Sequence, residues 1–193
     1  MRATTRSGPV RSEAARRAIL SAAVELLAER GYDQLAIEAI ASRAGVGKQT
    51  IYRWWGSKSA IIAEALLEGM ILRERLDVPN TGDIRADLGA WLREIGDVLL
   101  SKQGQGLARS LIAAATDNAE VGQRLRDAIA GSGALSTRLT AAIENESRLA
   151  ADAPIDEIAE SLVGALLLRA LSRSQLDDDA IEGLITVALG HAG

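Results

Sequence analysis

The chain contains 193 residues, of which 48% are apolar and 25% charged, with a formal net charge of −4. This composition is typical of a folded globular chain rather than a disordered one. The absence of Cys and the presence of a single His, His191, exclude disulfides, thiol nucleophiles and multi-histidine sites, so that no metal or cofactor is expected.

The charge is unevenly distributed along the chain. Residues 1–58 hold ten Lys and Arg against five Asp and Glu, whereas the remainder holds 12 against 21. A basic end on an acidic body favours contact with a polyanion such as DNA, although uneven charge on a solvated surface is the alternative. No apolar run approaches the roughly 18 residues that span a bilayer, and the basic N-terminus lacks the apolar core of a signal peptide. We therefore expect a cytoplasmic protein with no membrane partner.

The N-terminal part is predicted to be helical, since no period-two alternation indicates a strand. Residues 1–11 are predicted to form a flexible basic arm. A helix is expected over residues 12–30, with Ser12 as its N-cap and Gly31 as the left-handed residue at its end. Further helices are predicted over 37–44, over 48–54, and from the cap Ser57 towards Leu76.

The rest of the chain is predicted to be helical as well. Gly104-Gln105-Gly106 is expected to break the chain before a short helix, and Gly131-Ser132-Gly133 to kink a long one. The predicted helices run from Asp83 through Leu99, over 107–115, over 118–149, over 155–173, and from Asp177 onward. Together these elements predict an all-α fold of about nine helices.

Residues 37–55 have the size of a helix-turn-helix, because two short helices flank a turn that contains glycine. Ala41 is small where the helices must cross, and Gly45 can adopt the positive φ of a sharp turn. Val46 and Ile51 are expected to fill the space between the helices. The polar residues that remain face outward, where the contacts with bases and phosphates of duplex DNA are made.

The run from Ile40 to Lys58 resembles the DNA-binding signature of TetR-family (tetracycline-repressor-like) regulators. The resemblance covers about residues 12–60 and includes two departures: Ala36 and Gly47 stand where the family usually has hydroxyl residues. The matching residues are Ile40-Ala41, Ala44-Gly45-Val46, Thr50-Ile51-Tyr52, Trp55 and Ser57-Lys58.

The resemblance implies a homodimeric bacterial regulator associated with the nucleoid, most readily a repressor that releases a palindromic operator when a small molecule binds. It implies a DNA-binding domain over residues 12–56 and an effector-binding and dimerisation domain over 57–193. Tyr52 is expected to donate its hydroxyl to a phosphate, and Lys58 to share a phosphate with a helix N-terminus; packing or solvation is the alternative for each residue. The expected DNA contacts are Arg43, Lys48, Gln49, Thr50, Tyr52, Arg53, Trp54 and Lys58.

The last two helices are expected to form the dimer interface, because residues 158–171 are apolar around most of the helix circumference. An ordinary internal core is the alternative. The expected interface residues are Leu162, Gly164, Ala165, Leu168, Ile181, Leu184, Ile185 and Ala188. The resemblance also implies an effector pocket, whose candidate residues, each with plain core as the alternative, are Leu67, Met70, Trp91, Ile95, Arg109, Leu111, Asn118 and Leu135.

Two other function classes are the alternatives to a DNA-binding regulator. An enzyme is not expected, because the chain has no P-loop and no Gly-x-Ser-x-Gly motif, and Gly104-Gln105-Gly106 is too short for a dinucleotide fingerprint. A helical protein-interaction module that has lost DNA recognition is the second alternative, since Ala36 and Gly47 remove two hydroxyls. A steep dependence of duplex binding on salt distinguishes the regulator from such a module.

Overall fold

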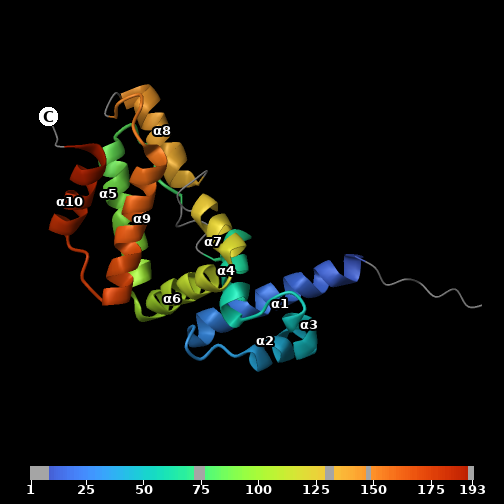
Figure 1. The fold of residues 1–193 in the computed structure, drawn as a ribbon. Helices are drawn as coiled ribbons and strands as arrows, with labels where there is room; N and C mark the ends of the chain where they lie inside the picture. The colour runs from blue at the N-terminus through green and yellow to red at the C-terminus, as the bar shows by residue number, and fades with distance from the viewer. Residues whose placement is uncertain (1–8, 72–76, 129–132, 147–148, 191–193) are drawn as a thin grey trace, which may run out of the picture.

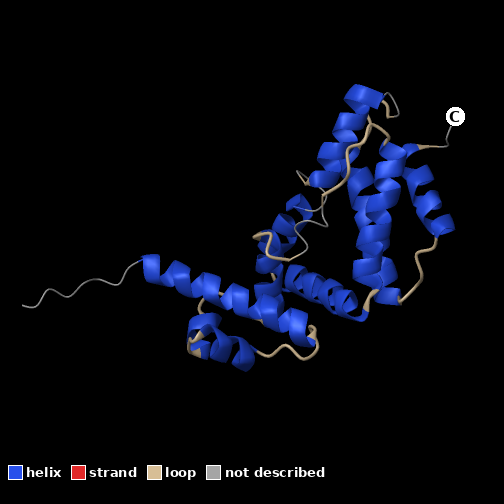
Figure 2. Cartoon of the chain, turned by 180° about the vertical axis from the view of Figure 1, so that it is seen from behind, coloured by secondary structure: helices blue, strands red, loops and turns tan. Residues whose placement is uncertain are grey.

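The computed structural model describes residues 9–71, 77–128, 133–146 and 149–190, and within these ranges it holds ten helices and no strand (Figures 1 and 2). The all-α prediction is confirmed. The helices are α1 (Pro9–Arg30), α2 (Ile37–Ala44), α3 (Lys48–Tyr52), α4 (Lys58–Leu67), α5 (Ile84–Leu100), α6 (Lys102–Asp117), α7 (Ala119–Arg126), α8 (Ala134–Glu146), α9 (Ile155–Ser172) and α10 (Asp178–Leu189).

Two hydrophobic cores organise the helices. The first joins α1, α2, α3 and α4 and extends into α6 and α7 through Leu107, Leu111 and Leu125. The second lies among α5, α8, α9 and α10. In Figure 1, α1–α3 form a lower layer, α6 crosses above it, and the bundle of the second core stands on top. The α2–α3 pair therefore lies at the end of the molecule remote from α8 and α10.

Most of the predicted helix ends are confirmed by their capping geometry. Ser57, Asp83, Asn118 and Asp177 each accept a hydrogen bond from a backbone N–H in the first turn of the helix that follows. The predicted start of the first helix is wrong, because α1 begins at Pro9 rather than after Ser12. Proline fits the first turn of a helix, where its missing N–H would have no partner.

The glycines of Gly104-Gln105-Gly106 do not break the chain, contrary to the prediction. They lie inside α6, whose N-cap Ser101 accepts a hydrogen bond from the Gly104 N–H at 3.0 Å. A Cβ at Gly104 would overlap the Val98 carbonyl oxygen and lie 2.7 Å from the Leu99 Cα. A Cβ at Gly106 would lie 2.8 Å from the Cβ of Tyr32. These glycines therefore permit close contacts that the local sequence does not reveal.

We expect Gly104→Ala to lower the free energy of unfolding by about 1–3 kcal/mol, the usual cost of overpacking. Gly89→Ala is the matched control, because a Cβ there would meet its nearest atoms, in the Arg93 and Ile185 side chains, at 3.4 and 3.5 Å. Alanine also favours a helix, so the control should be at least as stable as the wild type. Urea unfolding followed by circular dichroism measures both, and a Gly104→Ala protein of wild-type stability would contradict this role.

Three other predicted boundaries are corrected. The third helix ends at Tyr52 rather than Trp54, and α4 ends at Leu67, where Gly69 with φ of 68° follows. The predicted long helix over 118–149 is two helices, α7 and α8, which accounts for the higher helix count. Part of the predicted kink at Gly131-Ser132-Gly133 lies outside the described residues.

A buried ionic network joins α5 to α8, and the sequence analysis missed it. The Arg138 guanidinium, on a side chain only 2% exposed, donates from Nη2 to Asp87 Oδ2 and lies 2.6 Å from Glu146 Oε1. Its Nε also donates to Asp87 at 2.9 Å. Burial alone would raise the pKa of Asp87, but hydrogen bonds from Thr81 and Arg138 outweigh burial and lower that pKa. The network fixes α8 on α5 by charge as well as by apolar packing.

Candidate nucleic-acid interface

The α2–α3 unit has the geometry of a helix-turn-helix. Gly45 ends α2 in the left-handed region, with φ of 66°, and the Val46 N–H donates to the Ala41 carbonyl at 3.0 Å. Ala41 is buried against the neighbouring helices, and so is Ile51 on α3. The predicted packing of the turn is therefore confirmed, and α3 is fixed with one face inward and the other outward.

The outward face of α3 carries four of the predicted contacts. Lys48, Gln49 and Tyr52 are exposed, and so is Arg53, the residue that directly follows α3; Tyr52 is 55% exposed although it is large and aromatic. Lys48 Nζ donates to Glu38 on α2 at 3.1 Å, which leaves it at the surface. An exposed face with amide, phenol and cationic groups has the donors and acceptors that duplex DNA requires.

Thr50 and Trp54 are less available than their neighbours. Both are only partly exposed, and Trp54 packs against the first core. Its ring meets Trp55 edge to face with a centroid distance of 5.5 Å, and the Arg53 guanidinium lies 5.7 Å from the Trp54 centroid. Trp54 therefore packs behind the outward face of α3, and only part of its side chain is accessible for contact with DNA.

Arg43 points to α1 rather than outward. Its Nη1 and Nη2 donate to the two carboxylate oxygens of Glu29 at 2.5 and 2.9 Å. This hydrogen bond is the main reason that the pKa of Glu29 is lowered and that of Arg43 raised. To reach a base edge, Arg43 would have to exchange this bidentate partner, because the fork of the guanidinium is already occupied.

Lys58 also has a structural partner that the sequence did not reveal. Its Nζ donates to the carbonyls of Tyr32 and Leu35 at 3.0 and 2.9 Å, and it lies 4.4 Å from the centroid of the Tyr32 ring. The Tyr32 hydroxyl in turn lies 2.6 Å from the Ser59 hydroxyl. The start of α4 therefore holds the segment between α1 and α2, and this ammonium is only partly accessible.

Glu64 on α4 organises the interior of the DNA-binding part, and sequence reasoning did not find it. Its Oε2 accepts a hydrogen bond from the buried Trp55 indole at 2.5 Å, and its Oε1 accepts from Arg16 Nε at 2.7 Å. The hydrogen bond from Arg16 to Glu68 raises the pKa of that guanidinium. No local pattern signals this arrangement, because its members come from α1, α4 and the segment after α3.

The predicted effector residues do not meet at one cavity. Arg109 Nη2 donates to Asp33 at 2.7 Å, and Asn118 caps α7. Met70 is exposed and Leu67 packs on the first core, whereas Leu111 lines an apolar groove between α6, α7 and α9. The remaining three candidates are buried in the second core: Trp91, Ile95 and Leu135.

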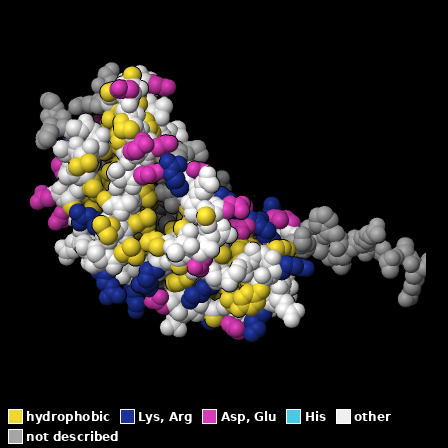
Figure 3. All heavy atoms as spheres, in the orientation of Figure 1, with side chains coloured by type: hydrophobic (Ala, Val, Ile, Leu, Met, Phe, Trp, Pro, Cys, Tyr) yellow, Lys and Arg dark blue, Asp and Glu magenta, His cyan; other side chains and the backbone are white. Residues whose placement is uncertain are grey.

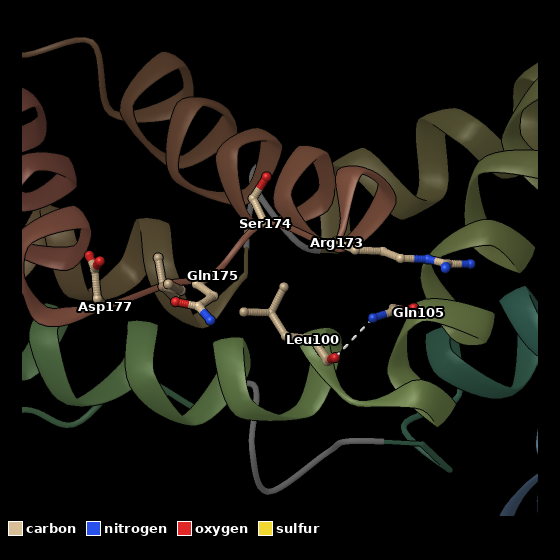
Figure 4. A pocket seen from close by; sticks show the side chains of 7 residues that line it. Leu100, Gln105, Arg173, Ser174, Gln175 and Asp177 are labelled. Carbon is tan, nitrogen blue, oxygen red and sulfur yellow. Dashed lines mark hydrogen bonds between the residues drawn. The ribbon is translucent and has the colours of Figure 1, made fainter.

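A larger hollow of about 370 Å³ lies where α5, α6 and the α9–α10 loop meet, and none of the predicted residues lines it (Figure 4). Figure 4 shows Leu100 and Gln105 on one side and the loop residues Arg173 to Asp177 on the other. Gln105 Nε2 donates to the Leu100 carbonyl at 3.0 Å, so this amide is already engaged at the wall.

The predicted dimer residues divide into two groups. Leu162, Ile181 and Ile185 are buried inside the subunit, and Ala165, Leu184 and Ala188 are partly buried. Gly164 is exposed, and Leu168 is 66% exposed. Two further large apolar side chains of these helices, which the prediction did not name, are exposed: Leu171 and Val187, the latter 79% exposed. We call Gly164, Leu168, Leu171 and Val187 the apolar face of α9 and α10.

Within the described residues, no helix is long and apolar enough to cross a membrane, and no group of three His, Asp or Glu side chains could hold a metal ion.

Comparison with known proteins matches both parts of the chain. Residues 19–65 match the profile described as bacterial regulatory proteins of the tetR family, and residues 78–188 match a tetracyclin repressor-like C-terminal domain. The chain is 39% identical over 100 residues to the uncharacterized HTH-type transcriptional regulator YdeS of Bacillus subtilis, covering 52% of this chain and 50% of that protein. It is 31% identical over 119 residues to the DNA-binding transcriptional repressor TetR of Mycobacteroides abscessus, covering 62% and 60% of the two chains.

The fold is likewise similar to those of solved regulators. The TetR family transcription regulator SCO0332 superimposes with a TM-score of 0.73 at 30% identity, over 93% of this chain and 99% of that one. Salmonella enterica GusR shares the fold at 18% identity, with a TM-score of 0.60 over 96% and 99% of the chains. The chain spans only about half the length of the first curated relative, 50%. The relatives YdeS, TetR and SCO0332 are all described as transcriptional regulators or repressors.

Proposed function

Because the chain belongs to the TetR family of bacterial regulatory proteins, in which the α2–α3 unit is the DNA-binding helix-turn-helix, we propose that it is a ligand-responsive repressor of a palindromic operator. The observation that carries the proposal is the outward face of α3, where Gln49 and Tyr52 are exposed beside Lys48. The repressor named among the relatives supports the direction of regulation.

Within the interface, Gln49 and Lys48 are the proposed base readers, and Tyr52 and Arg53 the proposed phosphate contacts. Gln can bind adenine through two hydrogen bonds, and Lys can bind guanine. Arg43 and Lys58 would contact DNA only by exchanging the partners described above, and Thr50 and Trp54 lie at the edge of the proposed interface. The DNA-binding domain proposed from the sequence, residues 12–56, leaves out α4, although α4 shares the first core with α1–α3.

Dimerisation is general among TetR-family regulators, and for this chain we propose the apolar face of α9 and α10 as the interface. Two-fold pairing would bury Leu168 and Val187, and each fully buried aliphatic side chain contributes about 1.5–3 kcal/mol. Gly164 has no heavy atom within 4 Å of where a Cβ would stand, so a partner helix can approach closely there. In Figure 3, hydrophobic side chains run along α9 on the face shown.

A route from the C-terminal part to the DNA-binding part supports the proposed ligand response. Gly106 of α6 packs directly on Tyr32, and Arg109 of α6 pairs with Asp33 at 2.7 Å. Both contacts are with the segment between α1 and α2, which Lys58 also holds. A shift of α6 would therefore move the segment between α1 and α2, which leads into the helix-turn-helix.

We expect Gln49→Ala to weaken binding to the selected operator about tenfold or more, since a bidentate base contact is worth about 1–3 kcal/mol. Gln123→Ala, at an exposed position of α7, is the matched control and should bind like the wild type. Fluorescence anisotropy on a labelled duplex measures both. Equal affinities for the two variants would remove Gln49 from the interface.

A further inference from the structure

An apolar groove of about 230 Å³ lies between α6, α7 and α9. Figure 3 shows this hollow on the face of the molecule seen in Figure 1, beside α9 and bordered by hydrophobic side chains. We call it the α6–α9 groove; its lining residues are Leu111, Ile112, Ala115, Leu125, Arg126, Glu160, Val163, Gly164 and Leu167.

The charged groups of the groove are a single ion pair between α7 and α9. Arg126 Nε lies 2.5 Å from Glu160 Oε1, and both side chains are exposed at the mouth of the groove. The attraction of Glu160 is the main reason that the pKa of Arg126 is raised, and Asp156 and Asp127 act in the same direction. The guanidinium of Arg126 thus lies within ion-pair distance of two carboxylates, Glu160 at 2.5 Å and Asp127 at 3.5 Å.

This imbalance of charge decides which ligand the groove favours. A cation that enters the mouth meets an excess of negative charge, and a low-dielectric apolar wall strengthens that attraction. A ligand cation can take Glu160 as its partner while Arg126 moves into water, where an exposed guanidinium is readily solvated. An anion would have to approach Glu160 and Asp127 in order to reach Arg126.

The groove is also placed to act on the DNA-binding part. Leu111 and Ala115 belong to the same helix as Gly106 and Arg109, which contact the segment between α1 and α2. Gly164 belongs both to the groove and to the apolar face of α9 and α10. A molecule inserted between α6 and α9 would therefore act on the helix that contacts the segment between α1 and α2 and on the helix that carries the proposed dimer interface.

We propose that the α6–α9 groove binds a small apolar molecule that carries a positive charge, with the charge at Glu160 and the apolar part between Leu111, Leu125 and Val163. The proposal rests on the ligand response proposed above and names the site and the chemical class of its ligand. Glu160 fixes the orientation of the ligand, and the apolar walls supply most of the affinity.

The test uses two probes with the same chain and opposite heads, n-octyltrimethylammonium and n-octanesulfonate, each below its micelle concentration. Isothermal titration calorimetry on the full chain is expected to show the ammonium binding at least tenfold more tightly than the sulfonate. Glu160→Gln should weaken ammonium binding about fivefold or more. Glu157→Gln is the matched control and should change little, because this exposed carboxylate, three residues earlier on α9, lines the hollow between α9 and α10 and not the groove.

Val163→Trp fills the groove and should abolish binding of the ammonium, with thermal unfolding used to check that the variant is folded. Tighter binding of the sulfonate, equal effects of Glu160→Gln and Glu157→Gln, wild-type binding by folded Val163→Trp, or no saturable binding of either probe would each overturn the proposal.

Release of the operator, measured in parallel, separates this inference from the proposed function. If the ammonium binds in the groove but leaves operator affinity unchanged, the site stands as a binding site and the ligand response fails. If a compound of any class releases the operator equally from the wild type and from Val163→Trp, the ligand response stands and the groove is not its site.

Discussion

Replacement of Arg138 by Leu is expected to lower the free energy of unfolding by about 3–5 kcal/mol, the cost of removing one partner from a buried ion pair. Arg138 forms an ion pair with Asp87, whose side chain is as deeply buried as that of Arg138. It also pairs with Glu146. Without the guanidinium, Asp87 would keep its desolvation penalty and lose its principal cation. The hydrogen bonds from the Thr81 backbone N–H and hydroxyl to Asp87 remain, but these donors carry no charge.

Urea unfolding followed by circular dichroism measures this loss. The double variant Asp87→Leu/Arg138→Leu is the control, because replacing a whole buried pair by apolar side chains is often neutral or better. It should recover part of the stability lost in the single variant, since it no longer leaves Asp87 unpaired, although Glu146 still loses Arg138. A single variant within about 1 kcal/mol of the wild type would show that the network does not hold α8 on α5.

The second large effect is expected from Leu168→Arg, which should convert the dimer into a monomer and weaken operator binding at least 100-fold. In a two-fold interface the same surface of each subunit faces its partner, so that the substitution adds a cation to both sides. Leu168 is largely exposed in the isolated subunit, and folding of the subunit should therefore be unaffected. A monomer holds only one half-site and loses the gain that comes from joining two.

Sedimentation velocity and fluorescence anisotropy on the operator measure these two changes. Gln123→Arg adds the same charge at an exposed position of α7 and should remain dimeric with wild-type affinity. A dimeric Leu168→Arg protein would place the interface elsewhere than the apolar face of α9 and α10.

The parts of the fold that depend on local signals could be predicted from the sequence. Gly45 supplies the left-handed residue that ends α2, and Ser57 and Asp83 cap the helices that follow them. The residues around each position are sufficient to predict these helix ends. The outward residues of α3 follow from the same spacing. The resemblance of residues 40–58 to the family's DNA-binding signature is sufficient to predict the family from the sequence.

The rest could not be predicted because its causes are contacts between segments distant in sequence. From the local sequence, Gly104 is expected to end a helix. In the structure it lies within α6, where a side chain would overlap the Val98 carbonyl. Arg138 and Asp87 are separated by 51 residues, and no pattern in the sequence pairs them. The partners of Arg43 and Lys58, namely Glu29, Tyr32 and Leu35, belong to other segments, so the sequence around Arg43 and Lys58 does not indicate them.

Selection of duplexes from a random DNA pool by the purified protein, at about physiological salt, would show whether the chain recognises a specific operator. A dimeric helix-turn-helix regulator predicts an enriched palindrome whose half-sites lie about one helical turn or a few base pairs more apart. Binding to that duplex should also fall steeply as salt rises. Weak and uniform binding with no enriched sequence would contradict the account and favour a helical interaction module without DNA specificity.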